Sequence, residues 1–327
     1  MIYKLIFLLS KKDKRKIFIL LIMTLVLSFI EIVGVSAIMP FISVASNPDL
    51  IYSNQYYKVV FDFFNLKSSQ EFIAYFGLFM IVFYLFRGVY TVLHGFVITR
   101  FSMNKYSDFS KKLYENYLNM PYIEFVEKNS SFMTKKIITE AFQLSQLVQN
   151  SLVFFSEVII VIIIYALLLI VDLNMTLILT VILGLKLLLL IFTLSKKIKK
   201  KGEERSNAQG ELYKLTNETF SNFKIVRLLS SQKKLLLKFK KSAANLSTAH
   251  IVNSTLALIP RSVLEAIGFS ILMGIVVYVV LIENNIEAVI PIISMYALAL
   301  YRILPAITRI VNSYNRIVFY SSSLDEV

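Results

Sequence analysis

The sequence predicts an all-α membrane protein with six long spanning helices that extend into the cytoplasm. Three observations predict this class: 57% of the 327 residues are hydrophobic, only 17% are charged, and the mean hydropathy is +0.67. An ordinary soluble domain is about 45–50% apolar and about 25% charged, so these values exclude a typical soluble enzyme and a disordered chain. The absence of cysteine excludes a disulfide scaffold and all thiolate chemistry.

Six apolar segments are long enough to cross a bilayer, which takes roughly 20 mostly apolar residues in a helix. They are residues 17–45, 72–101, 152–171, 173–194, 256–282 and 288–319. The first, second and last exceed that length, so we expect them to tilt or to extend into water. The third and fourth are separated only by Asp172, with Asn174 close behind it. This spacing predicts a tight hairpin.

The distribution of basic residues predicts the orientation. The segments before the first span, after the second and after the fourth carry 6, 6 and 14 lysines and arginines, and the other three connections carry 2, 0 and 0. Basic residues gather on the cytoplasmic side of membrane proteins, so both termini are predicted to be cytoplasmic. The net charge of +14 is therefore interpreted as a solvated cytoplasmic face, with no nucleic-acid partner.

Two long inner loops, residues 104–128 and 196–245, are charged but keep apolar residues such as Leu212 and Leu215 at helical spacing. They predict helices that project from the membrane. Their motifs are Leu118-Asn-Met-Pro-Tyr-Ile-Glu-Phe125, Ser131-Phe-Met-Thr-Lys-Lys-Ile137 with Glu140, and Asn217-Glu-Thr-Phe-Ser-Asn-Phe-Lys-Ile-Val226. These motifs resemble the two inner loops of ABC exporters of the six-helix type, with Ser131 and Glu140 where that family commonly has Gly and Asp.

The two ends of the chain resemble a narrower subgroup. Glu31-Ile-Val-Gly-Val-Ser-Ala-Ile-Met-Pro-Phe41, Tyr301-Arg-Ile-Leu-Pro305 and Leu324-Asp-Glu are similar to flippases of lipid-linked oligosaccharides, including the one that serves bacterial N-glycosylation. The resemblance covers essentially the whole chain. It implies ATP-driven flipping of a polyprenyl-pyrophosphate-linked oligosaccharide across the bacterial inner membrane. The alternative within the class is an exporter of another lipid, a peptide or a drug.

The resemblance also implies partners. It predicts a domain-swapped homodimer, in which spans four and five cross to the second copy, in contact with membrane lipid and with an ABC ATPase domain. None of the nine glycines begins a G-x-x-x-x-G-K-[ST] loop, so ATP and Mg²⁺ are expected in an ATPase that was truncated or is a separate chain. The residues expected to dock into that ATPase are Pro121, Tyr122, Ile123, Phe125, Glu218 and Phe220.

Ionisable residues inside spans are costly and count as functional candidates. They are Glu31, Arg87, His94, Glu157, Lys186, Arg261, Glu265, Arg302 and Arg309. Five basic residues face three acids, and the arginine fork suits phosphate oxygens in a dry setting. The predicted pyrophosphate site is therefore Arg87, Arg261, Arg302 and Arg309, and the alternative is internal pairing with the glutamates, or snorkelling of the basic residues towards the membrane surface.

The remaining candidates in the spans are interpreted as packing features. His94 is expected to be a polar packing residue, since the two histidines cannot form a metal site without further ligands. Gly88 and Gly95, seven apart, predict close helix packing. Two other classes remain: a channel or ion-coupled transporter would have helices broken at midplane, and a membrane enzyme would need a catalytic carboxylate or histidine cluster, which the sequence does not offer.

The outer loop contains a predicted amphipathic helix at residues 54–66. On a helical projection its apolar face holds Tyr56, Tyr57, Val59, Val60, Phe63, Phe64 and Leu66, whereas Phe61 strays towards the polar face. Such a face suits the membrane interface. The functional interpretation is a platform for a lipid tail formed by Tyr56, Tyr57, Val60, Phe63 and Phe64, and the alternative is a plain surface helix that covers the bundle.

Overall fold

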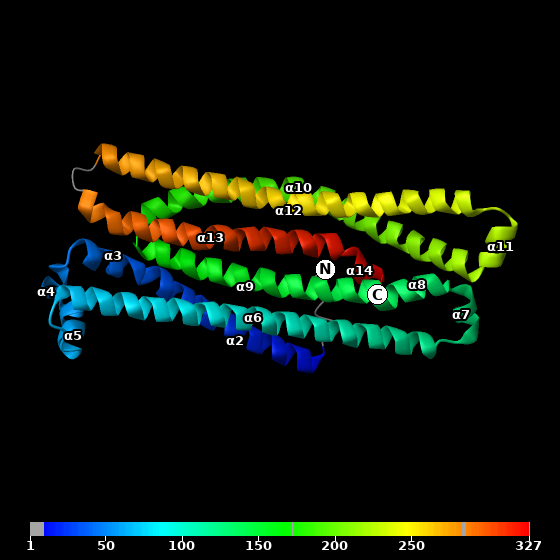
Figure 1. Cartoon of the computed structure of the whole chain (residues 1–327), viewed down its shortest axis with the longest axis horizontal. Helices are drawn as coiled ribbons and strands as arrows, with labels where there is room; N and C mark the ends of the chain where they lie inside the picture. Colours follow the sequence, from blue (N-terminus) through cyan, green and yellow to red (C-terminus); the bar gives the residue numbers. More distant parts are fainter. Residues whose placement is uncertain (1–9, 172, 283–285, 327) are drawn as a thin grey trace.

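The computed structural model describes residues 10–171, 173–282 and 286–326, with the side chains of only part of α10, α12 and α13, and every element in these ranges is a helix (Figure 1). The helices are α2 (Lys11–Ser36), α3 (Ile38–Ser46), α4 (Leu50–Ser53), α5 (Gln55–Phe63), α6 (Ser69–Leu118), α7 (Tyr122–Glu127), α8 (Ser130–Thr134), η1 (Lys135–Glu140), α9 (Ala141–Val171), α10 (Leu173–Ser221), α11 (Phe223–Leu228), α12 (Gln232–Ile282), α13 (Ile286–Tyr320) and α14 (Ser322–Glu326).

In the part of the chain that the structure describes, three helical stretches are long and apolar enough to cross a membrane: Lys11–Ser46, Ser69–Leu118 and Ser130–Ile170. They contain the first two predicted spans and all but the last residue of the third. The other predicted spans lie within α10, α12 and α13, and the structure does not describe many side chains of these helices. Six spans, and their crossing to a second copy, remain predictions.

The first predicted span is interrupted. It forms α2 and α3, with a break at Ala37. Pro40 lies in the first turn of α3 and has no N–H to donate to the carbonyl of Ser36, while its ring crowds that carbonyl. The proline therefore divides a segment whose hydropathy alone predicts one continuous helix.

The long helices of the molecule form two groups joined by α13. Leu27, Ile160 and Val311 belong to a buried cluster that joins α2, α9 and α13, and a second cluster joins α2, α6 and α9. A third cluster, which includes Ile198 and Leu256, joins α10, α12 and α13. In Figure 1, α10 and α12 accordingly run together on one side of α13, and α2, α6 and α9 lie on the other side.

The helices are much longer than a bilayer. α6, α10 and α12 contain 50, 49 and 51 residues, or about 75 Å each at 1.5 Å per residue, against about 30 Å for the hydrocarbon core. They continue through the two inner loops, as the helical spacing predicts. Figure 1 places α7 and α11 at one end of the molecule and α4 and α5 at the opposite end.

Candidate functional site

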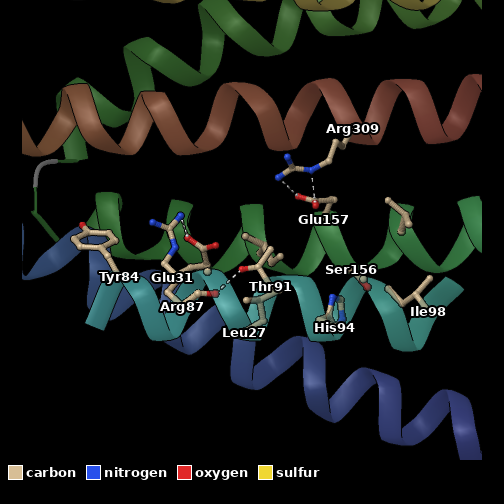
Figure 2. A pocket seen from close by; sticks show the side chains of 14 residues that line it. Leu27, Glu31, Tyr84, Arg87, Thr91, His94, Ile98, Ser156, Glu157 and Arg309 are labelled. Atoms are coloured by element: carbon tan, nitrogen blue, oxygen red, sulfur yellow. Dashed lines mark hydrogen bonds and ion pairs between the residues drawn. The ribbon is translucent and has the colours of Figure 1, made fainter. Parts of the chain in front are cut away.

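A cavity of about 520 Å³ opens among α2, α6, α9 and α13, at the level of the ionisable residues (Figure 2). Each of these four helices places a charged side chain on its wall: Glu31, Arg87, Glu157 and Arg309. Aliphatic residues such as Leu27, Ile98 and Ile160 fill the surface between them. The cavity is thus an apolar chamber with a few charged groups, the usual form of a site that orients an amphiphilic ligand.

The charges on the wall form two ion pairs between helices. Arg87 Nη2 lies 2.7 Å from Glu31 Oε2. Arg309 donates from Nε and Nη2 to the two carboxylate oxygens of Glu157, at 2.6 and 3.2 Å. One pair joins α6 to α2, and the other joins α13 to α9. Ion pairs therefore hold together two of the helix–helix contacts that form the cavity wall.

Further contacts orient Arg87. Its guanidinium carbon lies 5.5 Å from the centre of the Tyr84 ring, within cation–π distance. The Tyr84 hydroxyl donates to the Gly34 carbonyl at 2.9 Å, which holds α6 against α2. Arg87 is therefore positioned by an aromatic ring and a carboxylate from two elements.

His94 packs in a small polar cluster, as predicted. Its Nε2 lies 2.9 Å from the Thr24 hydroxyl, which lies 3.1 Å from the Ser156 hydroxyl. All three side chains are buried, so the cluster joins α2, α6 and α9 beside the cavity. Among the described residues, no three histidine or acidic side chains lie close enough together to hold a metal.

The structure brings only part of the predicted arginine site together in this cavity. Arg261 donates from Nε to Glu265 at 2.8 Å within α12, and both side chains are exposed outside this cavity. Arg87 and Arg309 share the cavity, whereas the side chains of Arg302 and Lys186 lie outside the described part. Of the four arginines predicted to bind pyrophosphate, the three whose side chains are described each contact one glutamate.

The packing role predicted for Gly88 and Gly95 is wrong. Both line the cavity, and a Cβ added to either would meet no atom within 4 Å. They widen the chamber because they lack a side chain at that face of α6. Gly202 and Gly268 are glycines that do pack closely: a Cβ on Gly202 would strike the backbone carbonyl of Phe319, and one on Gly268 would strike the side chain of Leu304, both on α13.

Comparison with known families decides the class. Residues 15–303 match the ABC transporter transmembrane region. This chain is the membrane domain of an ABC transporter. The match covers most of the 327 residues, and with the long apolar helices it makes the chain a multi-pass membrane protein of the exporter type. Membrane domains of this family pair with ATPase domains and dimerise.

The ABC transporter membrane domain exposes apolar side chains at the end where α7 and α11 lie. Pro121 caps α7, whose Tyr122, Ile123 and Phe125 are exposed. Phe220, at the end of α10 beside Glu218, is also exposed. Apolar side chains in water at a loop end are typical of an interface.

Helix α11 belongs to the same exposed end (Figure 1), although its residues are not among those predicted to dock. Its Phe223, Ile225 and Leu228 are exposed as well, and the break at Asn222 separates them from the end of α10. The signal in the sequence is the apolar spacing of residues 223–228, which the motif comparison covers only as far as Val226.

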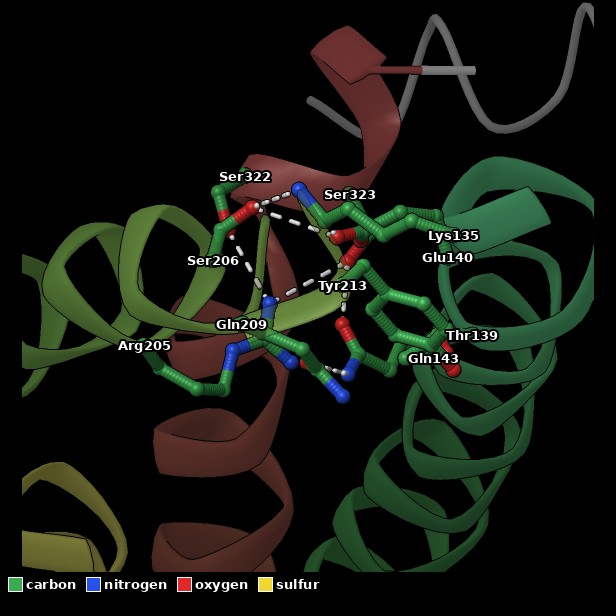
Figure 3. A network of polar contacts seen from close by, with 10 residues as sticks. All are labelled: Lys135, Thr139, Glu140, Gln143, Arg205, Ser206, Gln209, Tyr213, Ser322 and Ser323. Carbon is green, nitrogen blue, oxygen red and sulfur yellow. Dashed lines mark hydrogen bonds and ion pairs between the residues drawn. The ribbon is translucent and has the colours of Figure 1, made fainter. Parts of the chain in front are cut away.

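The ABC transporter membrane domain also contains a buried polar junction formed by residues of η1, α9, α10 and α14 (Figure 3). Lys135 Nζ lies 3.0 Å from Glu140 Oε1 and donates to the Ser206 hydroxyl at 2.9 Å. Arg205 donates from Nη2 to the hydroxyls of Ser322 and Ser323 at 3.2 and 3.3 Å. Lys135, Glu140 and Arg205 are all buried, so this junction ties η1 and α10 to α14.

Two features of the junction stabilise its buried charges. Burial alone would raise the pKa of Glu140, but the Ser323 hydroxyl and the charges of Lys135 and Arg205 lower it below the ordinary value of 4.5. Arg205 also lies 5.2 and 5.1 Å from the ring centres of Phe319 and Tyr320. The carboxylate is therefore held charged inside the protein.

At the opposite end of the ABC transporter membrane domain, α5 forms within the predicted range. Asn54 caps it by accepting from the Tyr56 N–H at 2.9 Å. The predicted placement of Phe61 on the polar side is wrong, because Phe61 and Tyr57 are the residues of α5 that pack inward, with ring centres 6.3 and 6.4 Å from that of Phe72. Helix α4 and the start of α6 supply partners that a single-helix projection does not contain.

The rest of the aromatic face stays open. Tyr56, Val60, Phe63 and Phe64 are exposed. An apolar cavity of about 950 Å³ lies between α5 and α6, and its wall includes Tyr56, Tyr57, Val60 and Phe64 but not Phe63. The structure therefore brings four of the five predicted tail-binding residues around one hollow.

Proposed function

We propose that this membrane domain flips a polyprenyl-pyrophosphate-linked oligosaccharide across the bacterial inner membrane, driven by an attached ATPase. The observation that carries the proposal is the pair of arginines, Arg87 and Arg309, on the wall of one chamber among the spanning helices. Charged groups at membrane depth are costly and are typical of substrate pathways. Arginine presents a planar fork of donors that matches phosphate oxygens.

The apolar hollow beside α5 supports the lipid part of the proposal. A polyprenyl chain is a long hydrocarbon, and it gains roughly 25 cal/mol for each Å² removed from water. The wall of the hollow includes Tyr56, Tyr57, Val60 and Phe64. In this proposal the tail stays along the outer aromatic surface while the pyrophosphate passes through the chamber.

The remaining parts of the proposal concern the assembly. Two copies associate with spans four and five exchanged, both termini face the cytoplasm, and ATP and Mg²⁺ bind in the ATPase. Pro121, Tyr122, Ile123, Phe125, Glu218 and Phe220 contact that ATPase, and α11 extends the same surface. Arg261 and Arg302 remain predictions for the pyrophosphate path, and the described cavity adds no support for Arg261.

Variants of the two cavity arginines test the function. In the transporter assembled with its ATPase in lipid vesicles, Arg87→Ala and Arg309→Ala should each reduce flipping of labelled lipid-linked oligosaccharide by about ten-fold or more, the loss expected when a charge-assisted contact worth about 1.5–3 kcal/mol disappears. Lys111→Ala, an exposed cation on the same α6, is the control. Full flipping by a stable Arg87→Ala/Arg309→Ala double variant would reject the proposal.

The alternative substrate classes make a different prediction. The ATPase activity of an exporter of a neutral lipid, a peptide or a drug would increase with those compounds and would not change with the lipid-linked pyrophosphate. Substrate-stimulated ATPase activity, measured with each class in turn, separates them.

A further inference from the structure

The two cavity ion pairs share an asymmetry. In each pair the arginine is more open to the chamber than its glutamate: the side chains are 26% and 2% exposed for Arg87 and Glu31, and 45% and 12% for Arg309 and Glu157. Both carboxylates line the cavity as well, but they are less accessible than the guanidinium groups. A ligand that enters the chamber meets the arginines first.

This arrangement places an internal anion where a phosphate would bind. A guanidinium has five N–H donors, and a carboxylate occupies at most two of them well. A bound phosphate must therefore share the guanidinium with the carboxylate, or draw it away. Sharing brings two anions close together in an apolar chamber, where they repel each other, and withdrawal separates the carboxylate from the arginine that neutralises it. Either course weakens the binding of the phosphate.

We propose that Glu31 and Glu157 are specificity-determining residues that compete with the substrate's phosphates for Arg87 and Arg309. The inference rests on the proposed function, because it takes a pyrophosphate as the ligand. In the empty chamber the glutamates neutralise both arginines and hold α2 to α6 and α9 to α13. When a pyrophosphate binds, they keep its affinity low enough for it to leave again.

The competition has a consequence for selectivity. A small anion that reaches only one arginine must overcome one glutamate and gains one contact. A pyrophosphate carries more negative charge and more oxygens, and both arginines line the same chamber (Figure 2), so in this proposal it binds to both. The glutamates thus increase the binding free energy that a ligand must supply. Only a strongly anionic ligand with an apolar tail supplies enough to bind.

Isosteric variants test the competition. The complete transporter, assembled with its ATPase in nanodiscs, is titrated with farnesyl pyrophosphate and with farnesol, its uncharged counterpart. Glu31→Gln and Glu157→Gln keep the side-chain shape and remove the charge. Each should lower the Kd for farnesyl pyrophosphate roughly three- to ten-fold and leave the Kd for farnesol unchanged. KM and kcat for lipid-linked substrate should fall together, because release becomes slower.

The control is Glu115→Gln on α6, which removes the same charge from an exposed pair with Lys111 outside the chamber, and it should bind as the wild type does. A merely structural glutamate would give weaker binding or a lower melting temperature, not tighter binding. Because the partner of Glu157 is nearly half exposed, Glu157→Gln keeps the test valid if Glu31→Gln fails to fold.

The outcomes separate the two proposals. Wild-type preference for farnesyl pyrophosphate over farnesol, with tighter binding by the glutamine variants, supports both. The same preference with unchanged or weaker binding by folded variants overturns the competition and leaves the proposed function standing. Equal binding of the two compounds by the wild type overturns both.

Discussion

Removal of the Glu140 charge should destabilise the membrane domain strongly. Glu140, Lys135 and Arg205 are buried together in the junction, so its described charges are two cations and one carboxylate. Glu140→Gln removes the carboxylate that lies 3.0 Å from Lys135 Nζ, while the two buried cations keep their charge. Loss of one partner from a buried pair costs about 3–5 kcal/mol, which is roughly two to four powers of ten in the unfolding equilibrium.

The balance of buried charges predicts which variants are more stable than others. Lys135→Met leaves Arg205 opposite Glu140, a neutral set, so it should cost less than Glu140→Gln. Lys135→Met/Glu140→Gln should be more stable than Glu140→Gln alone, because one buried cation is gone. Glu115→Gln, which breaks an exposed pair with Lys111, should change stability by no more than about 1 kcal/mol.

Unfolding with increasing dodecyl sulfate in detergent micelles, followed by circular dichroism, measures these differences. A Lys135→Met variant that is as unstable as Glu140→Gln would refute the charge-balance reasoning.

The effect of pH on stability has a definite sign. Because the pKa of folded Glu140 is below its ordinary value of 4.5, its contribution to stability is present above that value and is lost as the pH falls through the folded pKa. Glu140→Gln should lack this acid-dependent component.

Three further predictions concern packing and docking. Phe61→Ala should destabilise the outer end by about 1.5–3 kcal/mol, since this ring packs inward, whereas Phe63→Ala should leave the thermal melting curve nearly unchanged. Gly202→Ala should lower the melting temperature, because a Cβ would strike the Phe319 carbonyl and push α10 from α13; an unchanged temperature would mean that these helices adjust freely. A cysteine at Ile123 should cross-link to the ATPase in this cysteine-free chain, and free labelling of that cysteine in the assembled transporter would contradict the docking surface.

Features that depend on one segment could be predicted from the sequence. Long apolar runs predict the spanning helices because hydropathy is a local property, and helical spacing predicts that these helices continue beyond the length of a bilayer. The polar packing of His94 also follows from its apolar surroundings. The i,i+4 spacing of Arg261 and Glu265 could have identified their pairing within one helix, and it would have removed Arg261 from the cavity set.

Features that depend on contacts between distant segments could not be predicted. A helical projection places Phe61 by angle alone, but its packing depends on α4 and α6. Gly88 fits a small-residue pattern, yet the helix opposite it is too far away to touch. Similarly, nothing near Arg205 in the sequence indicates that its partners are the serines of α14, more than a hundred residues later.

Transport of the lipid-linked substrate itself tests the central claim most directly. The transporter, assembled with its ATPase, is reconstituted into vesicles that carry fluorescent polyprenyl-pyrophosphate oligosaccharide in the leaflet that faces the ATPase. The proposed function predicts that ATP and Mg²⁺ cause loss of label from that leaflet, and that Arg87→Ala/Arg309→Ala abolishes the loss. Label that stays in place while ATP is hydrolysed, in a preparation that moves another lipid, a peptide or a drug, would contradict the account.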